Sequence, residues 1–459
     1  MITKIKINGF KSFHNFEMSF TPFTVIAGTN ASGKSNLFDA LILLSKLAET
    51  DNIKRALSEQ RGEFLELFTM YDLNHYSNMM EFEVEMLVNK KVKDAWGNEA
   101  VLKYTRLRYH IKLKRFINKS GLDDVELIYE SLVNLKKNKD DEWVKYIPKS
   151  YTENWIPKVE GNRGKPYLDT IKVNEIDTVS IHQDGSKGGS IRHIPLVNAN
   201  RTVLSSIDTV DFKHILAAKE EMRSWKFLQL NPDDLREPTS KNNGEDEISQ
   251  TGKNLAAALF RISQNNLFAI GEISRKLNQF LPNFVEVKIV DDKENRQYII
   301  KLIDVDKKEY TSRVLSEGTL RILTLCILEY DEEFSGLLCF EEPENGINPQ
   351  RVSTMLDLLT DLSSDFSDDQ APLRQVIVNT HSPVLVGNLM KNYKNDQLKI
   401  LWFSQMRISI INVDDKKYKI ETTKIVLSEK TQQATLFKDR VTFSDIQDYL
   451  NMGKFDLIV

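Results

Sequence analysis

The stretch that decides the fold is residues 25–41, VIAGTNASGKSNLFDAL, which joins an apolar strand, a glycine-bracketed turn and a helical pattern. Within it, residues 28–35 read GTNASGKS and fit the pattern G-x-x-x-x-G-K-[ST]. Backbone N–H groups of such a loop form a nest for anions, and the dipole of the following helix adds to it. We therefore predict that Lys34 reaches the β- and γ-phosphates of a nucleotide and that Ser35 ligates Mg²⁺. The residues predicted to bind the nucleotide in this loop are Gly28, Asn30, Gly33, Lys34, Ser35 and Asn36.

The composition is that of a globular protein of two or three domains, with 459 residues and 41% hydrophobic content. A net charge of −4 does not indicate nucleic-acid binding, although a local basic face remains compatible with it. Cys326 and Cys339 both lie in apolar runs, which excludes a disulfide framework and predicts buried thiols in a reducing compartment. No apolar run approaches the length of a membrane span, so we expect a cytoplasmic protein without membrane contact.

A second motif lies about 300 residues further on, at residues 336–349, GLLCFEEPENGINP. A short apolar strand that ends in two carboxylates is how a buried parallel strand delivers acids to the carboxyl edge of a sheet. We predict that Glu341 orients Mg²⁺ through its water shell and that Glu342 polarises the attacking water. The structural alternative is a charged cap on a core strand.

A third motif, RQVIVNTHSPVLV from Arg374, follows the same logic with a different ending. Its apolar strand ends in Asn379, Thr380 and His381, which places an imidazole at the same edge. We predict that His381 contacts the γ-phosphate, the alternative being an ordinary structural histidine.

A fourth motif, LSEGT at residues 315–319, is a polar turn that opens an apolar helix. Free N–H groups and a hydroxyl at a helix N-terminus make a second anion site, formed by Ser316, Glu317 and Gly318. One protomer cannot easily fold both phosphate-binding helix ends onto one nucleotide. Two protomers arranged head to tail can.

These four elements, in this order, resemble the ABC-type ATPase head of the SMC, RecF and OLD group. GFKSF at residues 9–13 is similar to the opening strand and turn of SMC heads, LSEGT to the signature motif, LLCFEE to Walker B, and NTHSP to the switch-histidine loop of OLD-like ATPases. The resemblance implies an α/β fold: an ABC-type P-loop head with a mixed sheet, an antiparallel β subdomain and an inserted helical subdomain.

The variant forms LSEGTLR, EEPENGINP and TGKNLAAAL are most similar to compact bacterial AAA-annotated ATPases of anti-phage defence, such as the ATPase subunits of PARIS (AriA), Septu (PtuA) and AbiL-type systems. That resemblance implies a separate protein effector, often a nuclease. The sequence departs from the wider pattern in three ways: Glu341 replaces the usual Asp, Asn348 stands where a histidine is common, and no Q-loop is evident. Gln60 is the nearest glutamine after the loop, and the metal-sensing glutamine stays unassigned.

The long segment between the first and fourth motifs carries no sustained heptad repeat. Residues 80–87 place three glutamates on one face of a strand, and residues 106–115 place five basic side chains on one face of another. We predict an antiparallel pair with a cross-strand charge ladder; a DNA-binding basic face is the alternative. The expected domains are an N-terminal ATPase lobe at 1–200, an inserted helical subdomain at 201–285 and a C-terminal ATPase lobe at 286–459.

We therefore expect an enzyme that binds and hydrolyses ATP with Mg²⁺, and that forms a homodimer or higher oligomer with nucleotide sandwiched between heads. Its expected task is control of a protein effector in bacterial anti-phage defence. The chief alternative is a DNA-clamping ATPase of the RecF or SMC kind. An importer subunit and a scaffold that binds ATP without turnover are lesser alternatives.

Overall fold

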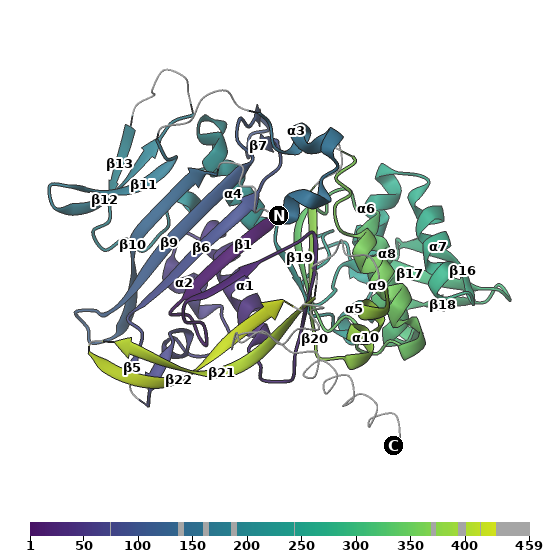
Figure 1. Cartoon of the computed structure of the whole chain (residues 1–459). Coiled ribbons are helices and arrows are strands. Elements are labelled where there is room, and N and C mark those ends of the chain that lie inside the picture. The colour runs from purple at the N-terminus through teal and green to yellow at the C-terminus, as the bar shows by residue number, and fades with distance from the viewer. Residues whose placement is uncertain are drawn as a thin grey trace.

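A computed structural model describes residues 1–73, 75–135, 142–158, 165–184, 191–242, 244–368, 373–392, 401–413 and 415–427. Two sheets organise these residues: an antiparallel sheet on one side and a mostly parallel sheet in the middle (Figure 1). Helices and a small third sheet cover the other side of the parallel sheet (Figure 1). The predicted α/β class is confirmed.

The central sheet has the strand order β14-β19-β20-β3-β21-β22. Its strands are β14 Lys226–Leu228, β19 Gly336–Glu341, β20 Arg374–Thr380, β3 Phe23–Ala27, β21 Leu401–Val413 and β22 Lys416–Leu427. All neighbours pair in parallel except β21 and β22, so the sheet is mixed, as predicted. The carboxyl ends of β3, β19 and β20 therefore meet at one edge.

Both faces of the central sheet are buried, and this explains why its strands are continuously apolar. Along β3, Ile26 packs into one hydrophobic core while Val25 and Ala27 pack into the other. Cys339 on β19 belongs to the first core and Phe340 to the second. The sheet thus separates two cores and fixes the polar strand ends beyond them.

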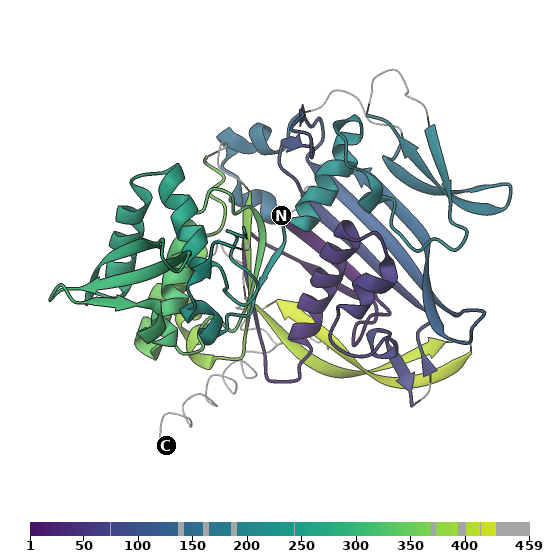
Figure 2. The same ribbon diagram turned by 180° about the vertical axis from the view of Figure 1, so that it is seen from behind.

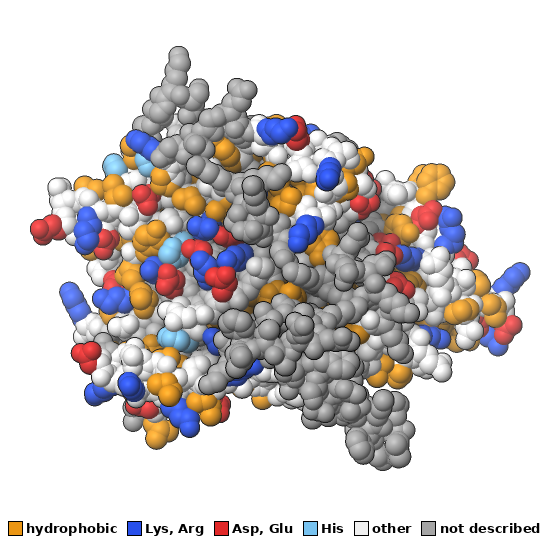
Figure 3. Space-filling view, viewed as in Figure 1, with side chains coloured by type: hydrophobic (Ala, Val, Ile, Leu, Met, Phe, Trp, Pro, Cys, Tyr) orange, Lys and Arg blue, Asp and Glu red, His pale blue; other side chains and the backbone are white. Residues whose placement is uncertain are grey.

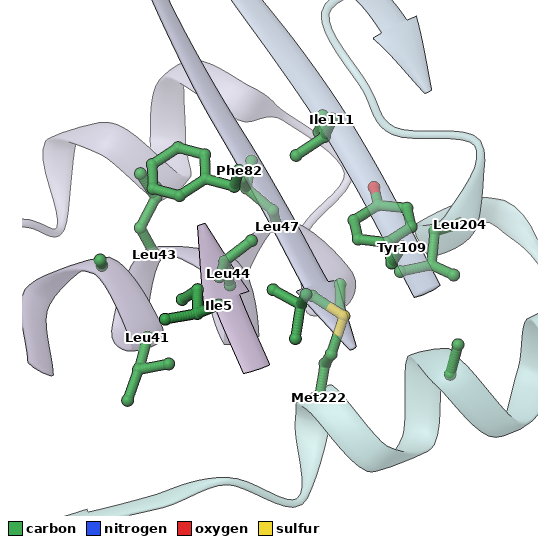
Figure 4. Close-up of a cluster of buried hydrophobic side chains, with 14 of the residues drawn as sticks. Ile5, Leu41, Leu43, Leu44, Leu47, Phe82, Tyr109, Ile111, Leu204 and Met222 are labelled. Atoms are coloured by element: carbon green, nitrogen blue, oxygen red, sulfur yellow. The ribbon is translucent and has the colours of Figure 1, made fainter. Parts of the chain in front are cut away.

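The antiparallel sheet has the strand order β13-β12-β11-β10-β9-β6-β1-β2. Its strands are β1 Ile2–Asn8, β2 Phe16–Ser19, β6 Met79–Leu87, β9 Arg106–Ile117, β10 Asp123–Asn134, β11 Leu168–Val173, β12 Ile176–His182 and β13 Ile191–Pro195. Helices α1 Lys34–Glu49, α2 Ile53–Ser58 and α4 Lys213–Arg223 cover one face, as Figure 2 shows. Alternating apolar residues of the strands meet the apolar side of α1 there, as with Phe82 and Leu43 in Figure 4.

The other face of this sheet carries the predicted charge ladder, and the register confirms it. Glu81, Glu83 and Glu85 of β6 lie opposite Lys112, His110 and Arg108 of β9, respectively. The ion pairs include Arg108 to Glu85 at 2.6 Å, Lys112 to Glu81 at 3.0 Å and Lys6 to Glu83 at 2.9 Å. Acidic and basic side chains are interspersed on this face in Figure 3.

The second core lies between the central sheet and the remaining helices. These are α5 Pro232–Arg236, α6 Leu255–Asn265, α7 Ala269–Phe280, α8 Glu317–Glu329, α9 Val352–Asp361 and α10 Pro383–Asn392. A third sheet packs on α7 and contains β15 Thr239–Ser240, β16 Phe284–Asp292, β17 Gln297–Asp304 and β18 Glu309–Thr311. Strands β16 and β17 form an antiparallel hairpin with its turn at residues 293–296.

Smaller elements include helix α3 Thr152–Trp155 and strands β4 Met70–Asp72, β5 His75–Tyr76, β7 Lys91–Lys93 and β8 Glu99–Val101. Residues 201–285 contribute to both cores, because α4 packs on α1 whereas α6 and α7 pack on α8. Across the described ranges, no helix is long and apolar enough to cross a membrane.

Candidate nucleotide site

The glycine loop lies between the carboxyl end of β3 and the first turn of α1, as its pattern predicts. Gly33 precedes the helix with φ +86°, a left-handed conformation that a glycine adopts without strain. Among the residues that the structure describes, no side chain caps the N-terminus of α1, and the first turn of this helix holds no acidic residue. The N–H groups of this turn are therefore available to an anion.

The loop is walled by the hairpin of β21 and β22. Ser404 Oγ donates to Ser32 O at 2.7 Å. A Cβ on Gly28 would lie 2.6 Å from Ser404 O, and one on Gly33 would lie 1.8 Å from Thr423 Oγ1. Both glycines are thus required by close approach of another segment.

Lys34 folds back over the loop. Its Nζ donates to Gly28 O and to Thr29 O, each at 2.8 Å, and the residue is buried. The pKa of Lys34 is lowered overall, because the effect of burial exceeds the opposite effect of the nearby carboxylates of Glu342, Glu341 and Glu344. The ammonium group is held at the mouth of the loop by neutral carbonyl oxygens.

Ser35 and Glu341 meet directly although 306 residues separate them in the chain. Ser35 Oγ donates to Glu341 Oε1 at 2.7 Å. Glu341 ends β19 and pairs in register with Asn379 of β20, which in turn pairs with Ile26 of β3. A hydroxyl and a carboxylate that share a hydrogen bond are hard oxygen donors, so this pair fits Mg²⁺.

Glu342 turns away from the strand with φ +49° and lies between two partners. His381 Nδ1 is 2.7 Å from Glu342 Oε1, and Asn345 Nδ2 donates to Glu342 Oε2 at 2.8 Å. The side chain of Glu342 is 33% exposed and that of His381 is 42% exposed. The two residues therefore form an accessible pair beside the loop.

Glu344 is a third carboxylate that sequence reasoning missed. Thr380 Oγ1 donates to its Oε1, and its Oε2 has no hydrogen-bond partner among the described residues. Burial raises the pKa of Glu344, against the hydrogen bond from Thr380. The E-x-E spacing in EEPENG was the available signal, because the turn at Pro343 sends the chain back to the strand end.

The predicted second anion site opens α8. Ser316 is the N-cap, and its Oγ accepts from Thr319 N at 3.3 Å. Glu317 forms an ion pair with Arg321 one turn later, at 2.8 Å. The side chains of Ser316 and Glu317 thus bond within the first two turns of their own helix.

Gly318 brings this helix end against the turn that follows Glu342. A Cβ on Gly318 would lie 2.5 Å from Gly346 O, and one on Gly346 would lie 2.8 Å from Glu317 Cδ. Gly346 also has φ +71°. The structure therefore joins Ser316, Glu317 and Gly318 to the loop of Glu342 within one protomer.

Of three further residues noted in the sequence, Asn36 and Asn348 have local partners. Asn36 Nδ2 donates to Ser12 Oγ at 2.7 Å, in the segment that reads GFKSF. Asn348 caps the turn at Pro349–Arg351, where its side chain accepts from Gln350 N at 3.0 Å. Asn30 is exposed at the loop.

A charged cluster under α1 was also missed. Asp39 is buried and accepts from Lys11 Nζ at 2.7 Å and from Arg61 Nη2 at 2.8 Å. Arg61 also reaches Ser35 O at 3.5 Å. The cluster joins the segment before the loop to the helix after it.

The glycine loop, the glutamates from Glu341 onward and the segment of Asn379 and His381 thus follow three parallel strands of one sheet. The family model described as "AAA domain, putative AbiEii toxin, Type IV TA system" matches residues 23–387. The chain belongs to this P-loop ATPase family, so the AAA part of the predicted resemblance is confirmed. No curated protein matches.

Solved structures of SMC heads are similar over almost the whole chain. An SMC head bound to the C-winged helix domain of ScpA is 14% identical, with 94% of this chain and 98% of that chain covered and a TM-score of 0.47. The SMC head domain from Thermotoga maritima is 12% identical, with coverages of 93% and 99% and a TM-score of 0.38. An SMC head with an extended coiled coil, bound to the C-terminal domain of ScpA derived from Pyrococcus furiosus, is 12% identical, with coverages of 93% and 96% and a TM-score of 0.40.

Proposed function

We propose that this protein binds ATP with Mg²⁺, hydrolyses it, and uses the cycle to control a separate protein effector in bacterial anti-phage defence. The observation that carries the proposal is the convergence of Ser35, Glu341, Glu342 and His381, from three segments, on the loop that holds Lys34. A charged cap on a core strand would not require these contacts.

The chemistry follows from the groups present. Lys34 exchanges its carbonyl acceptors for phosphate oxygens, which are better acceptors because they are ionised. Bound Mg²⁺ would neutralise charge on the β- and γ-phosphates, held by Ser35 and, through water, by Glu341. Glu342 accepts a proton from the attacking water, and His381 and Asn345 fix the direction of its carboxylate.

Two heads complete the site. The N-terminus of α8 is exposed at Ser316, and Val314 beside it is 69% exposed. The contact between Gly318 and Gly346 fixes this helix end beside the loop of Glu342. A second copy placed head to tail would bring its Ser316, Glu317 and Gly318 to the γ-phosphate.

The family description, which reads "putative AbiEii toxin, Type IV TA system", supports the defence part of the proposal. The predicted kinship with PARIS, Septu and AbiL-type ATPases belongs to this proposal. A nuclease is the expected kind of effector. ATP-driven closing of two heads would present or withdraw the surface that holds it.

The DNA-clamp alternative depends on the basic face of β9, and the structure gives that face little support. Arg108 and Lys112 form ion pairs with Glu85 and Glu81 of β6, and His110 Nε2 lies 2.7 Å from Glu81 Oε1. A phosphate backbone would have to displace those partners.

The test measures ATP hydrolysis and solution mass for the wild type and for Glu342→Gln, each with and without duplex DNA. We expect slow turnover that DNA does not change, and an ATP-stabilised oligomer in Glu342→Gln. Glu294→Gln, in the exposed turn of the β16–β17 hairpin, is the matched control and should behave as wild type. DNA-stimulated turnover would favour the clamp, and wild type without ATP binding would refute the proposal.

A further inference from the structure

A buried amide lies between the two residues that fit Mg²⁺. Asn379, at the end of β20, is only 2% exposed. Its Nδ2 lies 3.4 Å from Ser35 Oγ and 3.3 Å from Glu341 Oε1. The side chain therefore contacts both proposed metal-holding groups at once.

The amide oxygen of Asn379 is left without a hydrogen bond. Its Oδ1 is fully buried and has no partner in the described part of the chain. Buried polar atoms in folded proteins are almost always paired, so this oxygen is available to a partner that binds at the site.

A second amide on the same strand shows that the fold can satisfy such a group completely. Gln375 is also fully buried, at the opposite end of β20. Its Oε1 accepts from Ile2 N at 2.8 Å, and its Nε2 donates to Ile2 O at 2.8 Å and Thr21 O at 3.0 Å. The amide of Gln375 therefore has hydrogen-bond partners for both its oxygen and its nitrogen, whereas, within the described ranges, the amide of Asn379 has partners for its nitrogen only.

We propose that Asn379 is a positioning residue for Mg²⁺ in the nucleotide site, an inference that rests on the proposed function. Its Nδ2 holds the oxygens of Ser35 and Glu341 in place, and its Oδ1 accepts a hydrogen bond from a water molecule of the metal.

Asn379 thereby places an amide group at the proposed metal site, which Gln60, the nearest glutamine after the loop, does not do. Gln60 Nε2 donates to Ala56 O at 3.4 Å, within its own helical turn. A neutral amide also suits this position, because a third carboxylate beside Glu341 would repel it.

The test compares Asn379→Leu with Gln375→Leu, which removes the same kind of buried amide from the same strand. The dissociation constant of ATP is measured in Mg²⁺ and in EDTA, and Mn²⁺ binding to the nucleotide complex is followed by electron paramagnetic resonance. For Asn379→Leu we expect about 10-fold weaker ATP binding in Mg²⁺, unchanged binding in EDTA and about 10-fold weaker Mn²⁺ binding. Gln375→Leu should leave the ratio of the two ATP constants unchanged.

Asn379→Ala, which adds no apolar group, is the second variant and should show the same loss. If either variant binds ATP with the Mg²⁺ and Mn²⁺ dependence of wild type, the positioning role is wrong and the proposed function stands. If wild type binds no ATP in Mg²⁺ or in EDTA, the proposed function fails and this role fails with it. Equal losses in Gln375→Leu would also overturn the role, because they would show a general effect of disturbing β20.

Discussion

Two groups of glutamates in this molecule have opposite surroundings. On β6, Glu81, Glu83 and Glu85 alternate with basic side chains of the neighbouring strands. Burial raises the pKa of Glu81, but hydrogen bonds from Lys112 and His110 outweigh it and lower that pKa overall. Each of the three carboxylates has a lysine or arginine side chain as an ion-pair partner.

The glutamates after β19 are bonded differently. Glu341 bonds to a hydroxyl, Glu342 to an imidazole and an amide, and Glu344 to a hydroxyl. The nearest lysine, Lys34, gives its hydrogen bonds to backbone carbonyls. The ion-paired carboxylates of β6 fit a structural ladder. The glutamates after β19, which have no lysine or arginine bonded to them among the described residues, fit the proposed metal site.

The largest expected effect that separates the two groups is on turnover. Glu342→Gln removes the proton acceptor while keeping the shape of the side chain, so we expect kcat to fall about 100- to 10,000-fold. ATP affinity should change little, because Lys34 and the loop hold the phosphates. Single-turnover hydrolysis and equilibrium nucleotide binding check both parts. If Glu342→Gln kept wild-type turnover, another residue would have to be the catalytic base.

The next effect concerns a glutamate of the antiparallel sheet. Burial raises the pKa of Glu130 to about 7, against hydrogen bonds from Leu204 N–H, Val203 N–H and Tyr109. Because the pKa of Glu130 is higher in the folded than in the unfolded protein, the folded state binds a proton that the unfolded state has lost, and this binding stabilises the fold. The stabilisation is fully present below the unfolded pKa near 4.5 and is lost as pH rises through 7.

The free energy of unfolding should therefore fall by about 3 kcal/mol between pH 4.5 and pH 7 from this group alone. Urea unfolding across this range measures it. Glu130→Gln should be less stable overall, because one backbone N–H loses its acceptor, and its pH dependence should be flatter by that amount. An unchanged slope would contradict the assignment.

A smaller effect is expected at the contact between the α8 N-terminus and the Glu342 loop. Gly318→Ala places a Cβ 2.5 Å from Gly346 O, so the loop must shift and turnover should fall about 10-fold. Gly271→Ala in α7 is the matched control, since nothing lies within 4 Å of its Cβ. Steady-state hydrolysis by both variants, with circular dichroism to verify folding, is the measurement. If the two variants lost turnover equally, the loss would come from the changed helix propensity and not from the contact with Gly346.

The smallest effect belongs to the ladder. Arg108→Gln breaks the pair with Glu85, in which the arginine side chain is 37% exposed. We expect less than about 1 kcal/mol of lost stability and no change in turnover. Urea unfolding at low and high salt tests this, because salt should shrink the difference. A large loss of turnover would connect this face to the site.

Strand periodicity made much of the fold predictable. The run FTVIA, the run GLLCF and the alternating charges of residues 80–87 each indicate one kind of strand, and the structure has them as such. The meeting of Ser35 with Glu341 was also foreseeable, because parallel strands share a carboxyl edge.

Other contacts left no signature in the chain. Asn379 lies beside Glu341 only because β19 and β20 are neighbours in the sheet. A glycine is required at residue 33 because Thr423, on a hairpin far along the sequence, would clash with any larger residue there. Such approaches depend on tertiary packing, which short-range patterns do not encode. The domain limits and the catalytic roles remain predictions.

The hairpin of β21 and β22 has a consequence for the order of synthesis. Ser404 bonds to the loop at Ser32, and Thr423 contacts both Gly33 and Ser12. A ribosome that has made the first fifty residues has made the whole glycine loop but none of this hairpin. The nascent chain must wait until residue 423 has emerged before the loop is held on both sides, so the loop reaches its final surroundings only late in synthesis.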